Sequence, residues 1–145
     1  MTEDTQAENK LDEFIDKLAS LGYDIQQESK KPQIYSIDGQ LVNIRSRSEH
    51  KLADGNRLFW YSVTYSVLQE VKWVIYLMTT SDYFVMLPSS FLQLYKEDMY
   101  EDNKNSGVGV FDIDWDGLAI ELKGKRIPID GYAHDLVQRE YYPTF

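Results

Sequence analysis

The hydrophobic pattern begins with a helical period and then changes to a period of two. Residues 7–21, "AENKLDEFIDKLASL", carry acids in the opening turns and are followed by Gly22 as a stop signal. Their apolar positions form one stripe at helical spacing: Leu11, Phe14, Ile15, Leu18 and Leu21. This stripe predicts an amphipathic helix that covers a sheet, with residues 1–8 mobile ahead of it.

The strand-like pattern runs from residue 33 to residue 88. "QIYSI" and "QLVNIRS" flank Asp38-Gly39, which is a two-residue hairpin signal. The segments that follow, "RLFWYSVTYSV", "KWVIYLMTT" and "YFVMLP", are rich in aromatic and β-branched residues. We therefore expect an antiparallel meander of about five strands. Residues 72–79 and 83–87 are apolar on both faces, so we expect these strands to be central and covered on both sides.

The C-terminal half predicts two more helices and a hairpin. Pro88 ends the last central strand, and "SSFLQLYKEDMY" has a serine cap and helical spacing of its apolar residues. A hairpin near residue 116 and a short strand "RIPI" follow, and a last helix is expected near 131–140, with Tyr132, Leu136 and Val137 inward. The predicted class is α+β: a mainly antiparallel sheet plus a C-terminal hairpin, covered by an N-terminal, a middle and a C-terminal helix. A chain of 145 residues fits one domain, 1–145.

"FDIDWDGL", residues 111–118, starts like a calcium-binding loop because Asp112, Asp114 and Asp116 alternate and Gly117 follows. If Asp116-Gly117 is instead a two-residue hairpin loop, opposite residues have numbers that sum to 233, and three apolar pairs align: Trp115 with Leu118, Ile113 with Ile120, and Phe111 with Leu122. The twelfth position of a calcium loop needs a glutamate, and here it is Lys123. The pattern favours a hairpin without a metal.

The same register places Asp112 directly opposite Glu121 on the polar face. Like charges across a strand pair destabilise it, so we expect compensation by a divalent ion, by a lysine or arginine of a partner, or by solvent. Carboxylates at alternate strand positions repeat every ~6.6 Å and form a comb that suits basic groups. Neutralising Asp112, Asp114 and Glu121 together should leave the isolated fold unchanged or slightly more stable.

The net charge is −9, and both ends of the chain carry it. Residues 1–30 hold eight acids and three bases, residues 96–145 hold eleven acids and six bases, and residues 31–60 are net +2. Such acidity opposes non-specific binding to nucleic acid or to anionic lipid. We therefore expect a non-catalytic acidic protein-binding module, an inhibitor or adaptor, that engages a basic partner through the first helix and Asp112, Asp114, Asp116 and Glu121. A mimic of a nucleic-acid backbone is the sharpest version.

The basic segment "NIRSRSEHK" supports an alternative in which the chain binds nucleic acid. In an extended strand Asn43, Arg45 and Arg47 share one face and would line a phosphate path, extended by Lys51 and Arg57, with Tyr61 and Tyr65 as stacking surfaces. The order of elements over residues 11–100 loosely resembles the restriction-endonuclease-like nuclease core. That family holds magnesium with a Glu-x-Lys pair and an upstream Asp, whereas Asn43-Ile44-Arg45 stands here. The resemblance therefore implies nucleic-acid binding by a degenerate domain without the metal-binding carboxylate.

The sequence lacks the residues that several classes of function require. There is no cysteine, which excludes thiolate metal sites and suits a reducing compartment, so the cytoplasm is expected. No apolar run approaches the ~18 residues of a membrane span. His134 and Asp135 are adjacent on the predicted last helix and would point about 100° apart, so they cannot act as a catalytic pair. We expect no catalytic residue and no cofactor, and the sequence leaves the oligomeric state open.

Overall fold

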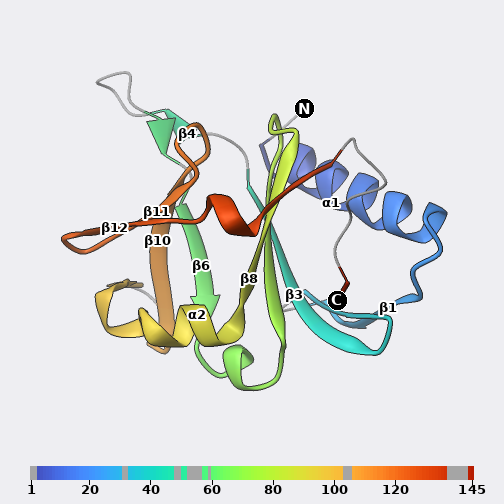
Figure 1. Cartoon of the computed structure of the whole chain (residues 1–145), viewed down its shortest axis with the longest axis horizontal. Helices are drawn as coiled ribbons and strands as arrows, with labels where there is room; N and C mark the ends of the chain where they lie inside the picture. The colour runs from blue at the N-terminus through green and yellow to red at the C-terminus, as the bar shows by residue number, and fades with distance from the viewer. Residues whose placement is uncertain are drawn as a thin grey trace.

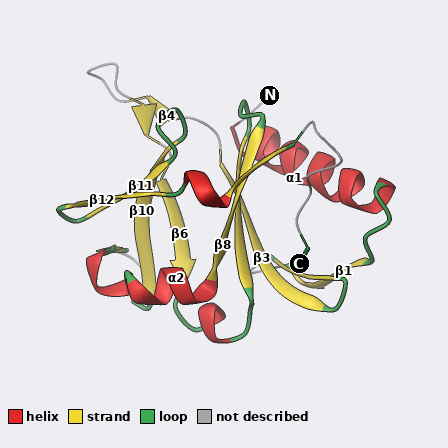
Figure 2. Cartoon of the chain, in the orientation of Figure 1, coloured by secondary structure: helices red, strands yellow, loops and turns green. Residues whose placement is uncertain are grey.

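The computed structural model describes residues 3–30, 33–47, 50–51, 57–58, 60–102, 106–136 and 144–145 (Figure 1). For residues 3–4, 50–51, 57–58 and 60 it describes the backbone alone. The described chain contains few helices and two main sheets of mostly antiparallel strands, as Figure 2 shows. The predicted α+β class is therefore confirmed.

The first sheet has six strands in the order β1 (Ile25–Ser29), β2 (Ile34–Ile37), β3 (Gln40–Arg47), β7 (Trp73–Met78), β8 (Tyr83–Pro88) and β13 (Ala133–Asp135). The predicted hairpin at Asp38-Gly39 is confirmed: both residues have positive φ, 49° and 83°, as the favoured two-residue turn requires. β3 and β7 are parallel, which the predicted meander did not contain.

The second sheet follows the order β12 (Lys125–Pro128), β11 (Ala119–Leu122), β10 (Val108–Asp114) and β6 (Trp60–Thr64), and β9 (Tyr100–Glu101) also pairs with β10. A small ribbon of β4 (His50–Lys51) and β5 (Arg57–Leu58) stands beside it. The strands that we expected in one meander thus divide between two sheets, with β6 in the second.

Helix α1 (Glu3–Ser20) covers one face of the first sheet (Figure 1). Leu11, Phe14 and Leu18 are at most 5% exposed and pack against the apolar side chains of β2, β3, β7 and β8. Burial of each such side chain contributes about 1.5–3 kcal/mol, so this stripe fixes which face of α1 looks outward. The predicted first helix is confirmed, and it begins four residues earlier than the pattern suggested.

The other face of the first sheet packs against the second sheet, while α2 (Ser89–Leu94) lies at the lower ends of the strands (Figure 1). Strands β7 and β8 contribute alternate residues to the two apolar clusters, one beneath α1 and one between the sheets. The expectation that these strands are covered on both sides is therefore confirmed, and α2 is the predicted middle helix.

The predicted C-terminal helix is wrong over 131–136. Residues 133–135 instead form β13 along the open edge of β8, with His134 opposite Phe84. Backbone hydrogen bonds to that free edge outweigh the helical spacing of Tyr132 and Leu136. The part of the prediction that concerns 137–140 lies outside the described residues. Among the described helices, none combines the length and apolar character that a membrane span requires.

Candidate functional site

The acidic hairpin joins β10 and β11 in the predicted register. The Cα partners are Asp112 with Glu121, Ile113 with Ile120, and Asp114 with Ala119. The loop, however, has four residues, 115–118, with Leu118 in the left-handed region at φ 49°, so Trp115 and Leu118 belong to the turn. The like-charge pair that we expected from the sequence therefore exists in the fold.

Arg126 of β12 supplies the positive charge that this pair lacks. It is the Cα partner of Glu121, and its guanidinium donates hydrogen bonds to the carboxylates of Glu121 and Asp114, the latter at 2.7 Å. We expected an ion, a partner or solvent to compensate the pair, whereas the structure provides a cation from the next strand of the same chain. The hairpin surface is consequently closer to neutral than its sequence suggests.

Asp114 also organises the turn. Its Oδ1 accepts the backbone N–H groups of Asp116 at 3.1 Å and Gly117 at 3.0 Å. The Gly117 N–H and then Arg126 hold the pKa of Asp114 below its usual value, against a smaller raising effect of burial. A Cβ on Gly117 would lie 2.5 Å from Arg126 Nη2, so glycine leaves the room that the guanidinium needs. Neutralising Asp114 should therefore destabilise the hairpin, which reverses the sign expected from repulsion alone.

The remaining hairpin acids differ in exposure. Asp112 is 9% exposed and engaged in an interaction within the chain, while Asp116 is exposed at the turn. Within the described ranges, no three His, Asp or Glu side chains gather closely enough to hold a metal ion. Of the four predicted partner-binding residues, Asp116 thus presents its carboxylate to solvent most openly, and Asp114 and Glu121 share Arg126.

Two of the three predicted side chains of the basic strand are buried or partly buried. Asn43 is 2% exposed and its Nδ2 donates to the Gln33 carbonyl at 2.9 Å. Arg45 is partly buried and donates to Ser62 Oγ of β6, whereas Arg47 is exposed. The predicted common face of these three residues is present, but it faces the second sheet and does not form an open path.

The other predicted nucleic-acid contacts are also accounted for. Lys51 and Arg57 are Cα partners in the small ribbon, and their side chains lie outside the described part. Tyr61 is 1% exposed and belongs to the core between the sheets, so it offers no face to a base. Tyr65 is partly buried and carries Lys96 Nζ over its ring at 4.5 Å.

Several polar side chains gather where β3 and β7 meet β6 and the turn after β10, and we call them the inter-sheet polar cluster: Arg45, Tyr61, Ser62, Tyr76 and Trp115. The Tyr61 hydroxyl donates to the Leu77 carbonyl at 2.8 Å, whereas Tyr76 Oη and Trp115 Nε1 are buried and have no hydrogen-bond partner in the described part of the chain. Burial lowers the pKa of Arg45, and the positive charge of Arg47 lowers it further, while Tyr76 acts in the opposite direction. These residues were not singled out together by the sequence.

The outer face of α1 is acidic. Glu8, Asp12 and Asp16 recur every four residues and are exposed, and Glu13 is exposed beside them. No ion pair joins any of these four carboxylates to a cation of the described chain. Lys10, on the same helix, donates instead to the Ser81 carbonyl at 3.0 Å. Figure 1 shows α1 at one end of the long axis and the β10–β11 hairpin toward the other, so the two acidic features face different surroundings.

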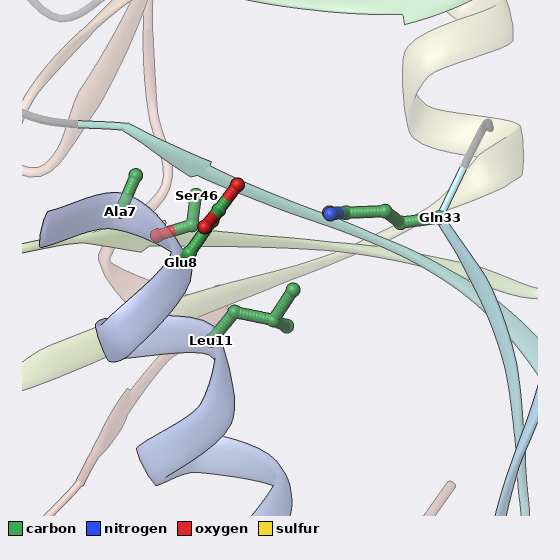
Figure 3. Close-up of a pocket in the computed structure, with 5 residues that line it drawn as sticks. All are labelled: Ala7, Glu8, Leu11, Gln33 and Ser46. Atoms are coloured by element: carbon green, nitrogen blue, oxygen red, sulfur yellow. The ribbon is translucent and has the colours of Figure 1, made fainter. Parts of the chain in front are cut away.

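A pocket of about 210 Å³ separates the first turns of α1 from the first sheet. Figure 3 shows its lining residues, with Glu8 and Ser46 on one side and Gln33 across from them. Ser46 Oγ is buried there and has no hydrogen-bond partner within the described ranges. Ser46 alternates with Arg45 along β3, so this pocket lies on the opposite face of the first sheet from the inter-sheet polar cluster.

Comparison with known proteins assigns no family. No family model and no curated protein matches the chain. One solved structure, described as "Crystal Structure of MepB", aligns with 63% of this chain and 68% of its own, at 9% identity and a TM-score of 0.34. Similarity at this level supports no argument about function.

Proposed function

We propose that this chain is a non-catalytic binding domain that presents an acidic face to a basic surface of another protein and so acts as an inhibitor or adaptor. The observation that carries the proposal is the outer face of α1. Its carboxylates are exposed, form no ion pair within the described residues, and stand on a helix whose orientation is fixed by a buried apolar stripe.

The spacing of these acids supports a recognition role. Residues four apart lie on one line of a helix, separated by about 6 Å along the axis. Like charges at this spacing destabilise an isolated helix by roughly 0.2–0.5 kcal/mol per pair, so Glu8, Asp12 and Asp16 carry a cost that a lysine at the middle position would remove. Basic side chains of a partner would offset the repulsion among these carboxylates and would be attracted to them. A line of regularly spaced anions also suits the sharpest version of the proposal, a mimic of a nucleic-acid backbone.

The test is a comparison of charge-matched variants. The immobilised 145-residue chain is incubated with an extract of the cells that produce it. Two variants are treated in the same way. The α1 variant carries Glu8→Gln, Asp12→Asn and Asp16→Asn, and the control variant carries Glu28→Gln, Glu70→Gln and Glu97→Gln. The control removes three exposed carboxylates that lie outside α1. Three exposed charges are worth about 0.6–3 kcal/mol together, or roughly threefold to over a hundredfold in affinity. We expect a basic protein to be retained by wild type and control and to be lost from the α1 variant. Equal retention by all three chains would contradict the proposal.

Nucleic-acid binding is the second candidate, and one observation favours it. Arg47 is exposed at the end of β3, two residues from the partly buried Arg45, in the net-positive segment of the chain. A low-salt shift assay with duplex and single-stranded DNA, using wild type and an Arg45→Gln, Arg47→Gln variant, tests it. Binding that rises steeply at low salt and is lost in this variant would make the arginine strand the functional surface.

A further inference from the structure

The inter-sheet polar cluster contains more hydrogen-bond donors than acceptors. Tyr76 is 0% exposed, and neither its hydroxyl nor the buried Trp115 indole N–H has a hydrogen-bond partner among the described residues. An indole N–H and a guanidinium can only donate. Because buried polar groups in folded proteins are nearly always paired, several unpaired donors in one region indicate a missing acceptor.

The members of the cluster are close neighbours. The Tyr61 ring contacts the rings of both Tyr76 and Trp115, with centroid separations of 4.9 and 6.1 Å. Arg45 is the Cα partner of Tyr76 across the parallel β3–β7 pair, and its charge lowers the Tyr76 pKa against the dominant raising effect of burial. Burial raises the pKa of Tyr61 well above its usual value. The Trp115 N–H near its hydroxyl acts in the opposite direction, although it forms no hydrogen bond of normal geometry there.

The charges around the cluster include one carboxylate, the buried Asp112, which raises the pKa of Tyr61 in addition to the larger effect of burial. The ion pairs among the described residues use Lys125 and Arg126, and none includes Arg45. Burial lowers the pKa of Arg45, and the like charge of Arg47 lowers it further. Asp112 is not among the groups that act on Arg45. A guanidinium that has lost hydration and forms no ion pair is stabilised by a bound anion. A bound water would accept from one or two donors but would leave the charge of Arg45 unchanged.

We propose that the inter-sheet polar cluster binds a small tetrahedral oxyanion, phosphate or a phosphate monoester, with Arg45 as the cation and the Tyr76 hydroxyl and Trp115 N–H as neutral donors. A tetrahedral oxyanion offers oxygens in several directions, which suits donors that come from the first sheet and from the β10–β11 turn. Two of its oxygens match the fork of a guanidinium. The exposed Arg47 marks the open end of the cluster from which the anion enters. This site is independent of the acidic face of α1.

The experiment titrates the full chain with sodium phosphate by calorimetry, with sodium chloride at the same ionic strength as the reference. Arg45→Met keeps an apolar stem but removes the charge, and Tyr76→Phe removes one hydroxyl while the ring remains. Hydrogen bonds to charged groups correspond to about tenfold to over a hundredfold in affinity, so each variant should bind phosphate at least tenfold more weakly. Lys30→Met and Tyr83→Phe, both at exposed residues away from the cluster, are the matched controls and should bind as wild type does.

A second titration with glycerol 2-phosphate separates the two sources of the anion: tighter binding of the ester identifies a phosphate monoester, and tighter binding of the ion identifies free phosphate. If Arg45→Met does not fold in phosphate-free buffer, Tyr76→Phe alone decides. The site would be refuted if the native chain showed no saturable phosphate binding above the chloride reference. It would equally be refuted if both variants bound phosphate as tightly as the wild type.

Discussion

Two buried tyrosines should respond in opposite ways to the loss of a hydroxyl. Tyr61 Oη donates to the Leu77 carbonyl at 2.8 Å, so Tyr61→Phe loses a hydrogen bond worth about 0.5–1.5 kcal/mol net. Tyr76 Oη is buried and has no partner among the residues that the structure describes. An unpaired buried hydroxyl costs about 1–3 kcal/mol, so Tyr76→Phe should recover up to that amount. The rings stay in place, because Tyr76 packs edge-on against Tyr61 and Phe111 in either variant.

The two effects together separate the variants by about 1.5–4.5 kcal/mol. Urea unfolding in phosphate-free buffer measures this difference; with a slope of about 2 kcal/mol/M the midpoints should differ by roughly 1–2 M. Wild type should fall between them, and the slopes should agree. If Tyr76→Phe lost more stability than Tyr61→Phe, the Tyr76 hydroxyl would have a partner in the protein, and the donor excess between the sheets would disappear with it.

Three further predictions concern the hairpin and β13. Millimolar calcium should not raise the melting temperature, since Lys123 stands where a calcium loop needs a bidentate glutamate; a rise that a chelator reverses would contradict this. The pKa of Asp114 is lowered in the folded protein, so its carboxylate stabilises the fold above the unfolded-state pKa, and this stabilisation is lost as pH falls through the folded-state pKa. Asp114→Asn should therefore lower the melting temperature at pH 7 and make the melting temperature depend less on pH in the acidic range. Burial lowers the folded pKa of His134, so the neutral form is favoured, and stability should decline as pH falls from about 6.5 through the folded value; His134→Gln should weaken that decline in acid melts.

The sequence correctly predicted the strand pairing in two hairpins, because short turn signals determine it. Asp38-Gly39 predicted a two-residue hairpin, and the sum of 233 predicted the pairing of Asp112 with Glu121. The turn between β10 and β11 is longer than expected because Asp114 accepts two N–H groups of the loop. A second two-residue loop was overlooked: Lys123-Gly124 pairs Leu122 with Lys125 and therefore Glu121 with Arg126. That pairing would have revealed the compensating cation from sequence alone.

The hydrophobic pattern of the sequence could not predict contacts between segments that are distant in the chain. The alternation of Asn43, Arg45 and Arg47 gave their common face correctly, but it could not show that a second sheet covers it. The parallel pair β3–β7 joins strands separated by the segment that contains β6, and no local signal marks it. The helical spacing near residue 134 did not produce a helix, because this segment pairs with the free edge of β8. Sequence patterns cannot show that pairing, since β8 lies about fifty residues earlier in the chain.

The central claim places partner binding on the acidic face of α1, and chemical-shift mapping by NMR tests it most directly. The 17.0 kDa chain is labelled with nitrogen-15 and titrated with the basic protein that the extract yields. The account predicts shifts concentrated at exposed residues 8–16 of α1, which weaken as salt rises. Shifts confined to residues 112–121, or to the end of β3 at Arg47, with α1 unchanged, would contradict it.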